Sequence, residues 1–296
     1  MNNLTLRQLR YFEAVAKHAH FGRAAEACAV SQPALSVQIK ELEETLGQAL
    51  FERTARKVRL TGFGEEFAKR VREILRAVEE LGELARTSRD ALAGRLRMGI
   101  IPTMAPYLLP SVIQRLTRAF PGLDLHVRET LTTGLLHELK DGRLDAAILA
   151  LPISDPALTE VDLFTEDFVL VRAGADWDKP VPSSESLREM RLLLLEEGHC
   201  FRDQALSFCS IQTAIPREGL DGSSLSTLVQ MVGAGIGVTL IPEMAVPVET
   251  KSADVSVARF DHPRPFRRVG MVWRRSSPLA PQLRKVAEIV QQAGQM

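Results

Sequence analysis

Residues Ser31–Glu43 read SQPALSVQIKELE, and their spacing predicts a helix. Ser31 is a natural N-cap, because its hydroxyl can accept a hydrogen bond from a backbone N–H of the first turn. Pro33 is tolerated in that turn, where its missing N–H costs no intrahelical bond. Apolar residues spaced 4-3-4 form the inner face of this helix, and they are Leu35, Ile39, Leu42 and Leu46. The outer face carries Pro33, Val37, Lys40 and Glu41, with Ser36 on its flank.

Two further helices are predicted upstream. Residues Thr5–Gln8 fit a capping box that opens the first of them. Its inner face is expected to contain Leu6, Leu9, Val15 and Ala16. The second covers residues 21–28, whose alanines permit close packing against another helix. Two short helices joined by a tight turn indicate a helix-turn-helix, a motif that places its second helix in the major groove of DNA.

The charges of the helix that begins after Ser31, the second helix of this motif, limit how it can approach DNA. Glu41 and Glu44 would repel phosphates, so only its N-terminal half is expected in the groove. A basic turn follows at 53–57, before the alternating residues Val58 and Leu60. Alone, this turn is better interpreted as a solvated loop, but beside a helix-turn-helix a β-wing that contacts the DNA backbone is favoured. The predicted DNA-binding residues are Ser31, Gln32, Pro33, Ser36, Gln38, Lys40, Arg53 and Arg56.

A long helix is predicted next, since no proline interrupts residues 65–91. Its apolar residues alternate in steps of four and three, which is the heptad spacing of a coiled coil. They are Phe67, Val71, Ile74, Val78, Leu81 and Ala85. An amphipathic helix lying on a core is the alternative. The length, the charged flanks and the regular spacing favour a coiled coil that pairs two chains.

From Gly94 onward the pattern alternates between strands and helices. Strands are expected at 96–100, 123–127, 146–149, 168–171, 192–195, 238–241 and 269–273, and helices at 108–120, 134–140, 226–232 and 279–292. This alternation indicates an α/β fold with largely parallel sheets, in which ligands bind beyond the carboxyl ends of strands. The glycines at 233–237 precede a strand, so they lack the context of a nucleotide-binding loop.

Two of the three cysteines, Cys200 and Cys209, lie in the charged segment 196–209, just after a predicted strand. His199 and Arg202 flank Cys200 and could hold its thiol as the thiolate, the form that reacts with oxidants. In a straight helix the two Cα atoms would be about 13 Å apart, and in an extended chain about 30 Å. A disulfide needs about 5.5–6 Å. If these thiols join, a regular element must bend or melt, which would make the pair a switch.

Composition bounds the setting of these motifs. The 296 residues can form two or three domains, and the formal net charge of zero means that any basic field for nucleic acid must be local. The segment after Met1 has no apolar signal-peptide region, and no run approaches the roughly 18 apolar residues of a membrane span. A cytoplasmic protein is expected, and cytosolic disulfides are usually catalytic or sensory. Cys28, in an alanine-rich helix, is interpreted as a small buried hydrophobe.

Five short motifs lie close together within about sixty residues: FGRAA at 21–25, SQPALS at 31–36, IKELE at 39–43, LFER at 50–53 and LTGFG at 60–64. Together they resemble the N-terminal domain of LysR-type transcriptional regulators. The resemblance implies an α-rich winged helix-turn-helix at 1–62, a long dimerisation helix at 63–92 and an α/β effector domain at 93–296. That domain would be periplasmic-binding-protein-like, with two Rossmann-like subdomains, one at about 93–163 plus 267–296 and the other at about 164–266.

The cysteine segment narrows the resemblance. Residues 198–205 and 208–209, with 101–110 and 240–242, are similar to the hydrogen-peroxide-responsive activators of that family. The similarity implies that Cys200 is the peroxidatic cysteine, oxidised first to a sulfenic acid, and that Cys209 is the resolving cysteine of a redox-active disulfide. The pocket residues that it implies are Thr103, Thr132, His199 and Arg202, with Thr133 able to share or replace Thr132.

The same resemblance implies a regulator rather than an enzyme. It would activate oxidative-stress genes as a homotetramer, a dimer of dimers. Its expected partners are double-stranded promoter DNA, hydrogen peroxide, RNA polymerase and a cellular disulfide reductant. No cofactor, metal or membrane is expected.

Three other hypotheses remain open. A LysR-type regulator could answer a small metabolite, with incidental cysteines. A thiol peroxidase would consume oxidant over many turnovers. A metal site built from His199, Cys200 and Cys209 is the third, but three ligands at this spacing match no zinc pattern.

Overall fold

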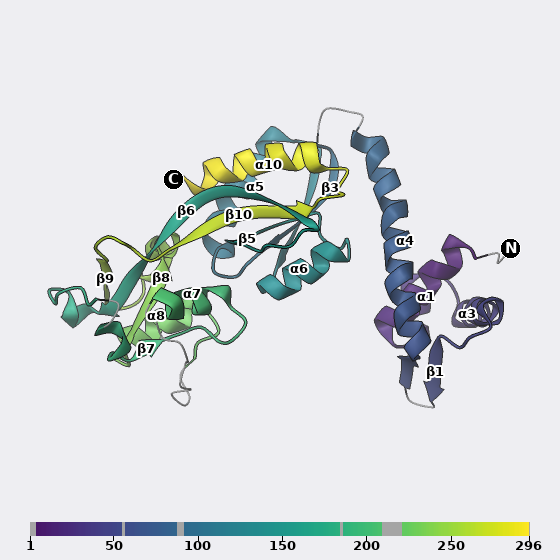
Figure 1. Ribbon diagram of the computed structural model, residues 1–296, viewed down its shortest axis with the longest axis horizontal. Coiled ribbons are helices and arrows are strands. Elements are labelled where there is room, and N and C mark those ends of the chain that lie inside the picture. The colour runs from purple at the N-terminus through teal and green to yellow at the C-terminus, as the bar shows by residue number, and fades with distance from the viewer. Residues whose placement is uncertain (1–3, 55–56, 88–91, 184–185, 209–220, 296) are drawn as a thin grey trace. The chain divides into compact units, whose positions relative to one another are not determined.

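The computed structural model describes residues 4–54, 57–87, 92–183, 186–208 and 221–295. The chain forms two compact units, at 1–85 and 86–296 (Figure 1). Among the described residues, no helix is both long enough and apolar enough to cross a membrane.

The first unit is a winged helix-turn-helix with a long helix after it. Its elements are α1 (Leu6–His18), α2 (Phe21–Ala27), α3 (Gln32–Leu46), β1 (Phe51–Thr54), β2 (Lys57–Leu60) and α4 (Gly62–Thr87). The predicted capping box is present, because the side chains of Thr5 and Gln8 each accept a hydrogen bond from the other residue's backbone N–H. Ser31 caps α3, and Gly47 ends it with a φ of 66°, a left-handed conformation that glycine adopts without steric cost.

The inner face of α3 is buried as predicted, with Leu35, Ile39 and Leu42 fully covered. The prediction for α1 is wrong at Leu6, which is 43% exposed. The buried face of α1 is centred on Phe12 instead, and helical periodicity then turns Leu6 toward solvent. Strands β1 and β2 pair antiparallel and form the predicted wing.

Helix α4 has two kinds of surface along its length. Phe67 and Val71 pack into the core of the first unit, whereas Ile74 is 45% and Leu81 66% exposed. The first turns of α4 therefore lie on a core, as in the alternative interpretation. The exposed apolar residues come after these turns. The side chain of Ala85 lies outside the described part of the structure.

The second unit is an α/β domain. Its strands are β3 (Gly94–Ile100), β4 (Leu123–Glu129), β5 (Ala146–Leu151), β6 (Leu158–Ala173), β7 (Leu192–Leu193), β8 (Val238–Pro242), β9 (Val255–Arg259) and β10 (Phe266–Arg274). Its α-helices are α5 (Ala105–Ala119), α6 (Thr132–Lys140), α7 (Cys200–Phe208), α8 (Leu225–Gly233), α9 (Val246–Glu249) and α10 (Ala280–Gly294). Short 3-10 helices lie at Gly174–Asp176, Ser186–Arg188 and Glu243–Ala245.

The sheet of this unit runs in the order β4-β3-β5-β10-β6-β8-β7, with β9 also paired to β6. The predicted "largely parallel" arrangement is wrong, because β10 pairs antiparallel with β5 and β6, and β6 pairs antiparallel with β8 and β9. The prediction fails because of β6, a strand of 16 residues that pairs antiparallel with all three of its neighbours. Four of its first ten residues are acidic, so the sequence predicts a strand only at the apolar run 168–171.

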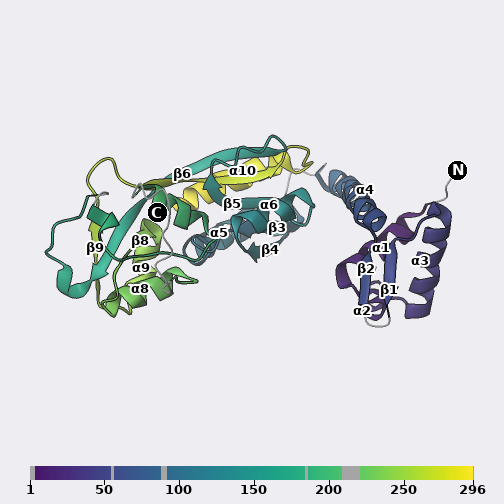
Figure 2. The ribbon, with the colours of Figure 1, turned by 60° about the horizontal axis from the view of Figure 1, so that its bottom comes forward.

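Strands β6 and β10 connect two hydrophobic cores (Figures 1 and 2). The first core gathers β3, β5 and much of β10 under α5 and α10. The second gathers the end of β6 with β8, α7 and α8. Each core lies beside the same pair of long strands, so a side chain at their junction can contact both.

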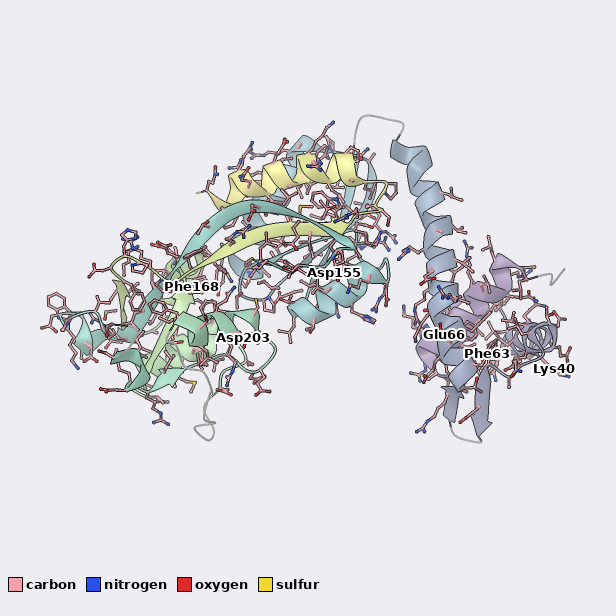
Figure 3. The ribbon with its side chains drawn as sticks, in the orientation of Figure 1. Lys40, Phe63, Glu66, Asp155, Phe168 and Asp203 are labelled. Carbon is pink, nitrogen blue, oxygen red and sulfur yellow. The ribbon has the colours of Figure 1, made fainter. Side chains whose placement is uncertain are left out.

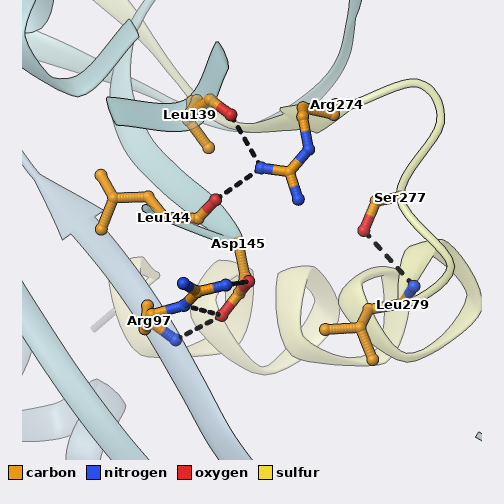
Figure 4. Close-up of polar contacts among 7 residues, drawn as sticks. All are labelled: Arg97, Leu139, Leu144, Asp145, Arg274, Ser277 and Leu279. Carbon is orange, nitrogen blue, oxygen red and sulfur yellow. Dashed lines mark hydrogen bonds and ion pairs between the residues drawn. The ribbon is translucent and has the colours of Figure 1, made fainter. Parts of the chain in front are cut away.

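Buried polar contacts fix the loops of the first core (Figure 4). Asp145 accepts hydrogen bonds from the backbone N–H of Arg97 at 2.7 Å and from its guanidinium at 2.7 Å. Arg274 donates to the carbonyl oxygens of Leu139 and Leu144, each at 2.7 Å. These bonds satisfy backbone groups that burial would otherwise leave unpaired.

Candidate functional site

Cys200 is the first residue of α7. The chain reaches it from β7 through Leu195, which bridges to Gly222. It then turns at Gly198, whose φ of 95° favours glycine. A Cβ added at Gly198 would also lie 3.1 Å from the side chain of Leu131. The tight turn therefore carries Cys200 close to the start of α6.

A small cavity lies at this point. It is lined by Ile101, Pro102, Thr103, Leu131, Thr132, Gly198, His199, Cys200 and Phe201. The space for the centre of a water-sized molecule is about 10 Å³, near the minimum that holds one water. The structure thus brings together four of the predicted site residues, Thr103, Thr132, His199 and Cys200. Thr133 is exposed and does not line the cavity.

Two threonine hydroxyls are available to a small polar molecule here. The Oγ1 of Thr132 is buried and has no hydrogen-bond partner among the described residues. The Oγ1 of Thr103 accepts a hydrogen bond from Arg267 Nη1 at 2.8 Å. Since that oxygen already accepts, its own proton is left for another acceptor. Both hydroxyls can therefore donate into the cavity.

Arg267 and Glu166 support Thr103, and sequence reasoning missed both. Arg267 is buried on β10 and donates through Nε to Glu166 Oε2 at 2.7 Å. The other oxygen of Glu166 accepts the backbone N–H of Met244 at 3.0 Å. A signal existed in the sequence, because strand alternation places Arg267 on the same face as the buried Val269.

His199 is half-buried, and burial lowers its pKa, while the nearby Glu196 carboxylate opposes part of that shift. A histidine whose pKa lies below its ordinary value of about 6.5 is neutral at pH 7. A neutral imidazole offers one donor and one acceptor but no positive charge. His199 can therefore donate or accept a hydrogen bond in the cavity, but it adds no positive charge to stabilise a thiolate.

Arg202 is placed differently from the prediction. Its guanidinium donates to the carbonyl oxygen of Leu195 at 2.6 Å and pairs with Asp221 at 3.1 Å. It is buried but is not one of the cavity-lining residues. Its contacts instead hold the turn that precedes α7.

The cavity lies where the two cores meet. Cys200 packs against the first core, and Phe201 belongs to the second. The Phe201 ring packs edge-on against Phe168 of β6, with centroids 4.7 Å apart, and Figure 3 labels Phe168 there. Cys209 lies outside the described residues. In the described part of the chain, no group of three or more His, Cys, Asp or Glu side chains could hold a metal ion.

The candidate DNA interface is the outer side of α3. Gln32, Pro33 and Lys40 are exposed, Ser36 and Gln38 are partly exposed, and Ser31 acts as the cap. Figure 3 labels Lys40 on the side of α3 away from α4. Lys40 pairs with Glu44 at 3.6 Å. The side chain of Arg53 and all of Arg56 lie outside the described residues.

We expect Lys40→Ala, Arg53→Ala and Arg56→Ala each to weaken DNA binding on all sequences alike. Each lost phosphate contact should reduce the slope of log affinity against log salt by about 0.9. Titration of the full chain with duplex DNA at several salt concentrations measures this slope. Lys251→Ala, an exposed lysine of the second unit, is the control. An unchanged slope would remove the substituted residue from the interface.

Comparison with known proteins identifies the family of both units. Residues 6–65 match the family described as bacterial regulatory helix-turn-helix protein, lysR family, and residues 89–295 match the LysR substrate binding domain. A probable hydrogen peroxide-inducible genes activator of Streptomyces viridosporus is 45% identical over 98% of this chain and 94% of its own length. The DNA-binding transcriptional dual regulator OxyR of Escherichia coli K12 is 42% identical over 97% and 95%.

Two solved structures are similar over 98% of this chain. One is a full-length cysteine variant of OxyR from Pseudomonas aeruginosa, 38% identical, with a TM-score of 0.79 and 95% of that chain covered. The other is a hydrogen-peroxide-bound cysteine variant of OxyR from Corynebacterium glutamicum, also 38% identical, with a TM-score of 0.68 and 92% covered. These likenesses span both units.

Proposed function

The chain belongs to the LysR family of transcription regulators, and from that premise we propose that it is a hydrogen-peroxide sensor that activates oxidative-stress genes. Cys200 is the residue that peroxide oxidises, and Cys209 then closes a disulfide with it. The observation that carries the proposal is the cavity of about 10 Å³ that gathers Cys200 with two threonine hydroxyls and a neutral histidine. A cavity this close to the size of one water is too small for a typical metabolite, and of the ligands considered peroxide is nearest to it in size.

The chemistry proceeds in two steps. The Cys200 thiolate attacks one peroxide oxygen, the O–O bond breaks, and the second oxygen leaves as hydroxide. Thr103 and Thr132 donate hydrogen bonds to the departing oxygen, which takes up a proton and becomes water. The product is a sulfenic acid. The Cys209 thiolate then attacks the Cys200 sulfur, the S–O bond breaks, and the oxygen leaves as hydroxide, which takes up a proton and becomes a second water. The two thiols together supply the two electrons that reduce peroxide. A cellular disulfide reductant restores the thiols.

The place of Cys200 supports a link from this chemistry to the fold. Its side chain packs on the first core while the next residue is anchored in the second. Pulling Cys200 toward Cys209 removes the first contact and strains the start of α7. The arrangement of the two cores, and with it the presentation of the DNA-binding units, then changes.

The assembly follows from α4. Ile74, Val78 and Leu81 form the part of its apolar seam that is not covered by the first unit's core. A coiled coil between two chains buries these residues, and two such dimers make the proposed homotetramer. Its working partners are promoter DNA and RNA polymerase in the cytoplasm.

Mass spectrometry of the reduced protein before and after one equivalent of hydrogen peroxide tests the proposal. The expected result is a loss of two hydrogens that maps to a cross-link between the peptides of Cys200 and Cys209. Unchanged mass at both cysteines, or oxidation confined to Cys28, would contradict it.

We expect Cys209→Ser to separate oxidation from switching. Cys200 should still form the sulfenic acid, which a sulfenic-acid-specific reagent traps, but no disulfide can hold the rearranged state. Promoter activation should therefore be weak or transient. Full and lasting activation in this variant would refute the disulfide lock, and Cys28→Ser serves as the control for removal of a thiol.

A further inference from the structure

Helix α3 exposes a large apolar side chain on its outer face. Val37 is 54% exposed, and among the described residues from 4 to 60 it is the most exposed large apolar side chain. Leu35 and Ile39, two residues to either side of it, are fully buried. Two helical positions correspond to about 200° of rotation, so Val37 points directly away from the core.

The residues around Val37 set its chemical surroundings. Pro33 and Ala34 are exposed one turn earlier, so the outer side of the N-terminal half of α3 has an apolar apex. Polar groups flank it, and the acidic ones are occupied. Gln38 donates to Glu41 at 2.6 Å, and Lys40 pairs with Glu44 at 3.6 Å.

Only one group in the major groove matches an aliphatic apex. Each base pair presents donors and acceptors there, and thymine alone adds a C5-methyl group. Polar residues beside the apex can reach neighbouring base edges or phosphates, but a valine cannot form a hydrogen bond. Its favourable contact is with the thymine methyl, and over cytosine or adenine it would cover polar atoms without pairing them.

We propose that Val37 determines specificity by contacting the C5-methyl group of a thymine in each half-site. This inference rests on the proposed function, because it requires that α3 bind DNA in the major groove. It goes further by naming the base and the atom that this chain recognises.

Replacing thymine by uracil removes only that methyl group and so tests the contact. Sites are first selected by the wild-type full chain from a random duplex pool, and each thymine of the selected site is then replaced singly by uracil. Wild type should lose about fourfold in affinity at one thymine per half-site, the effect of one buried methyl group. Val37→Ala should bind the thymine and uracil duplexes equally, and Val37→Ile should keep the discrimination.

Folding does not confound this comparison. Alanine is a better helix former than valine, and the side chain removed contributes nothing to the core, so Val37→Ala should be at least as stable as wild type. Leu6→Ala, which truncates an exposed aliphatic residue on α1, is the matched control and should discriminate as wild type does.

The possible failures are distinct. If wild type selects a sequence but Val37→Ala retains the full thymine preference, the inference is overturned and the proposed function stands. If wild type enriches no sequence at all, the regulator proposal fails and takes the inference with it.

Discussion

Cys200→Ser is expected to abolish the response to peroxide. A few per cent of ordinary cysteine thiols are ionised at neutral pH, whereas a serine hydroxyl is not, so oxidation should slow by at least about 100-fold. Thr103, Thr132 and His199 would remain in place, because serine occupies nearly the same volume. Stopped-flow measurement of peroxide consumption by the reduced protein gives the rate, and a promoter fusion gives the response in cells.

The same variant separates the alternatives. Cys28→Ser is the matched control, since burial raises the pKa of the Cys28 thiol and makes it a poor nucleophile. If Cys200→Ser still activates promoters on peroxide challenge, the chain responds to a metabolite instead. If wild type consumes many equivalents of peroxide in the presence of a reductant, a thiol peroxidase activity is the better description.

Among the substitutions proposed for this chain, Arg267→Met should cause the largest loss of stability. Arg267 and Glu166 are both buried, and their ion pair measures 2.6 Å. Removing one partner leaves an uncompensated buried carboxylate, which costs about 3–5 kcal/mol. Urea unfolding of the reduced protein, followed on the transition of the effector domain, measures this loss.

The adjacent residue supplies the control. Arg268 pairs with Asp162 at 2.6 Å, but both side chains are about half exposed or more, at 48% and 62%. Arg268→Met should therefore leave the stability almost unchanged, because water screens this exposed pair. The double variant Arg267→Met with Glu166→Leu should regain much of the lost stability, because no unpaired charge remains. A double variant as unstable as Arg267→Met alone would contradict the ion-pair account.

The double variant also tests the site. Without Arg267, no other described residue fixes the Thr103 hydroxyl as a donor toward the cavity. We expect the refolded double variant to react with peroxide more slowly than wild type while its Cys200 remains accessible to a thiol reagent. An unchanged peroxide rate would mean that Arg267 only supports the fold.

The parts of the fold that sequence reasoning predicted are those with local causes. The cap at Ser31, the capping box at Thr5 and the 4-3-4 spacing of α3 each operate within a few residues. The residues that line the cavity were found through resemblance, because Thr103, Thr132 and Cys200 come from segments that only the folded sheet brings together.

What the sequence did not reveal depends on contacts between distant residues. Glu166 and Arg267 are 101 positions apart, and neither lies in a motif that indicates a pair. Strand β6 was predicted at only a quarter of its length, since acidic residues interrupt its apolar pattern. The resemblance implies Arg202 as a pocket residue, whereas its guanidinium contacts Leu195 and Asp221.

Because α4 is anchored in the first unit, a tilt of this helix moves the DNA-binding elements with it. Phe67 and Val71 pack its first turns into the same core as α3, so the winged helix-turn-helix and this helix must rotate together. With 26 residues, α4 is about 39 Å long. A tilt of about 5° at its far end then displaces the winged helix-turn-helix by roughly 3.4 Å, one base-pair step of DNA. In the proposed dimer, a change of a few degrees in the crossing angle of two such helices would therefore shift the two DNA-binding units by about one base pair relative to their half-sites.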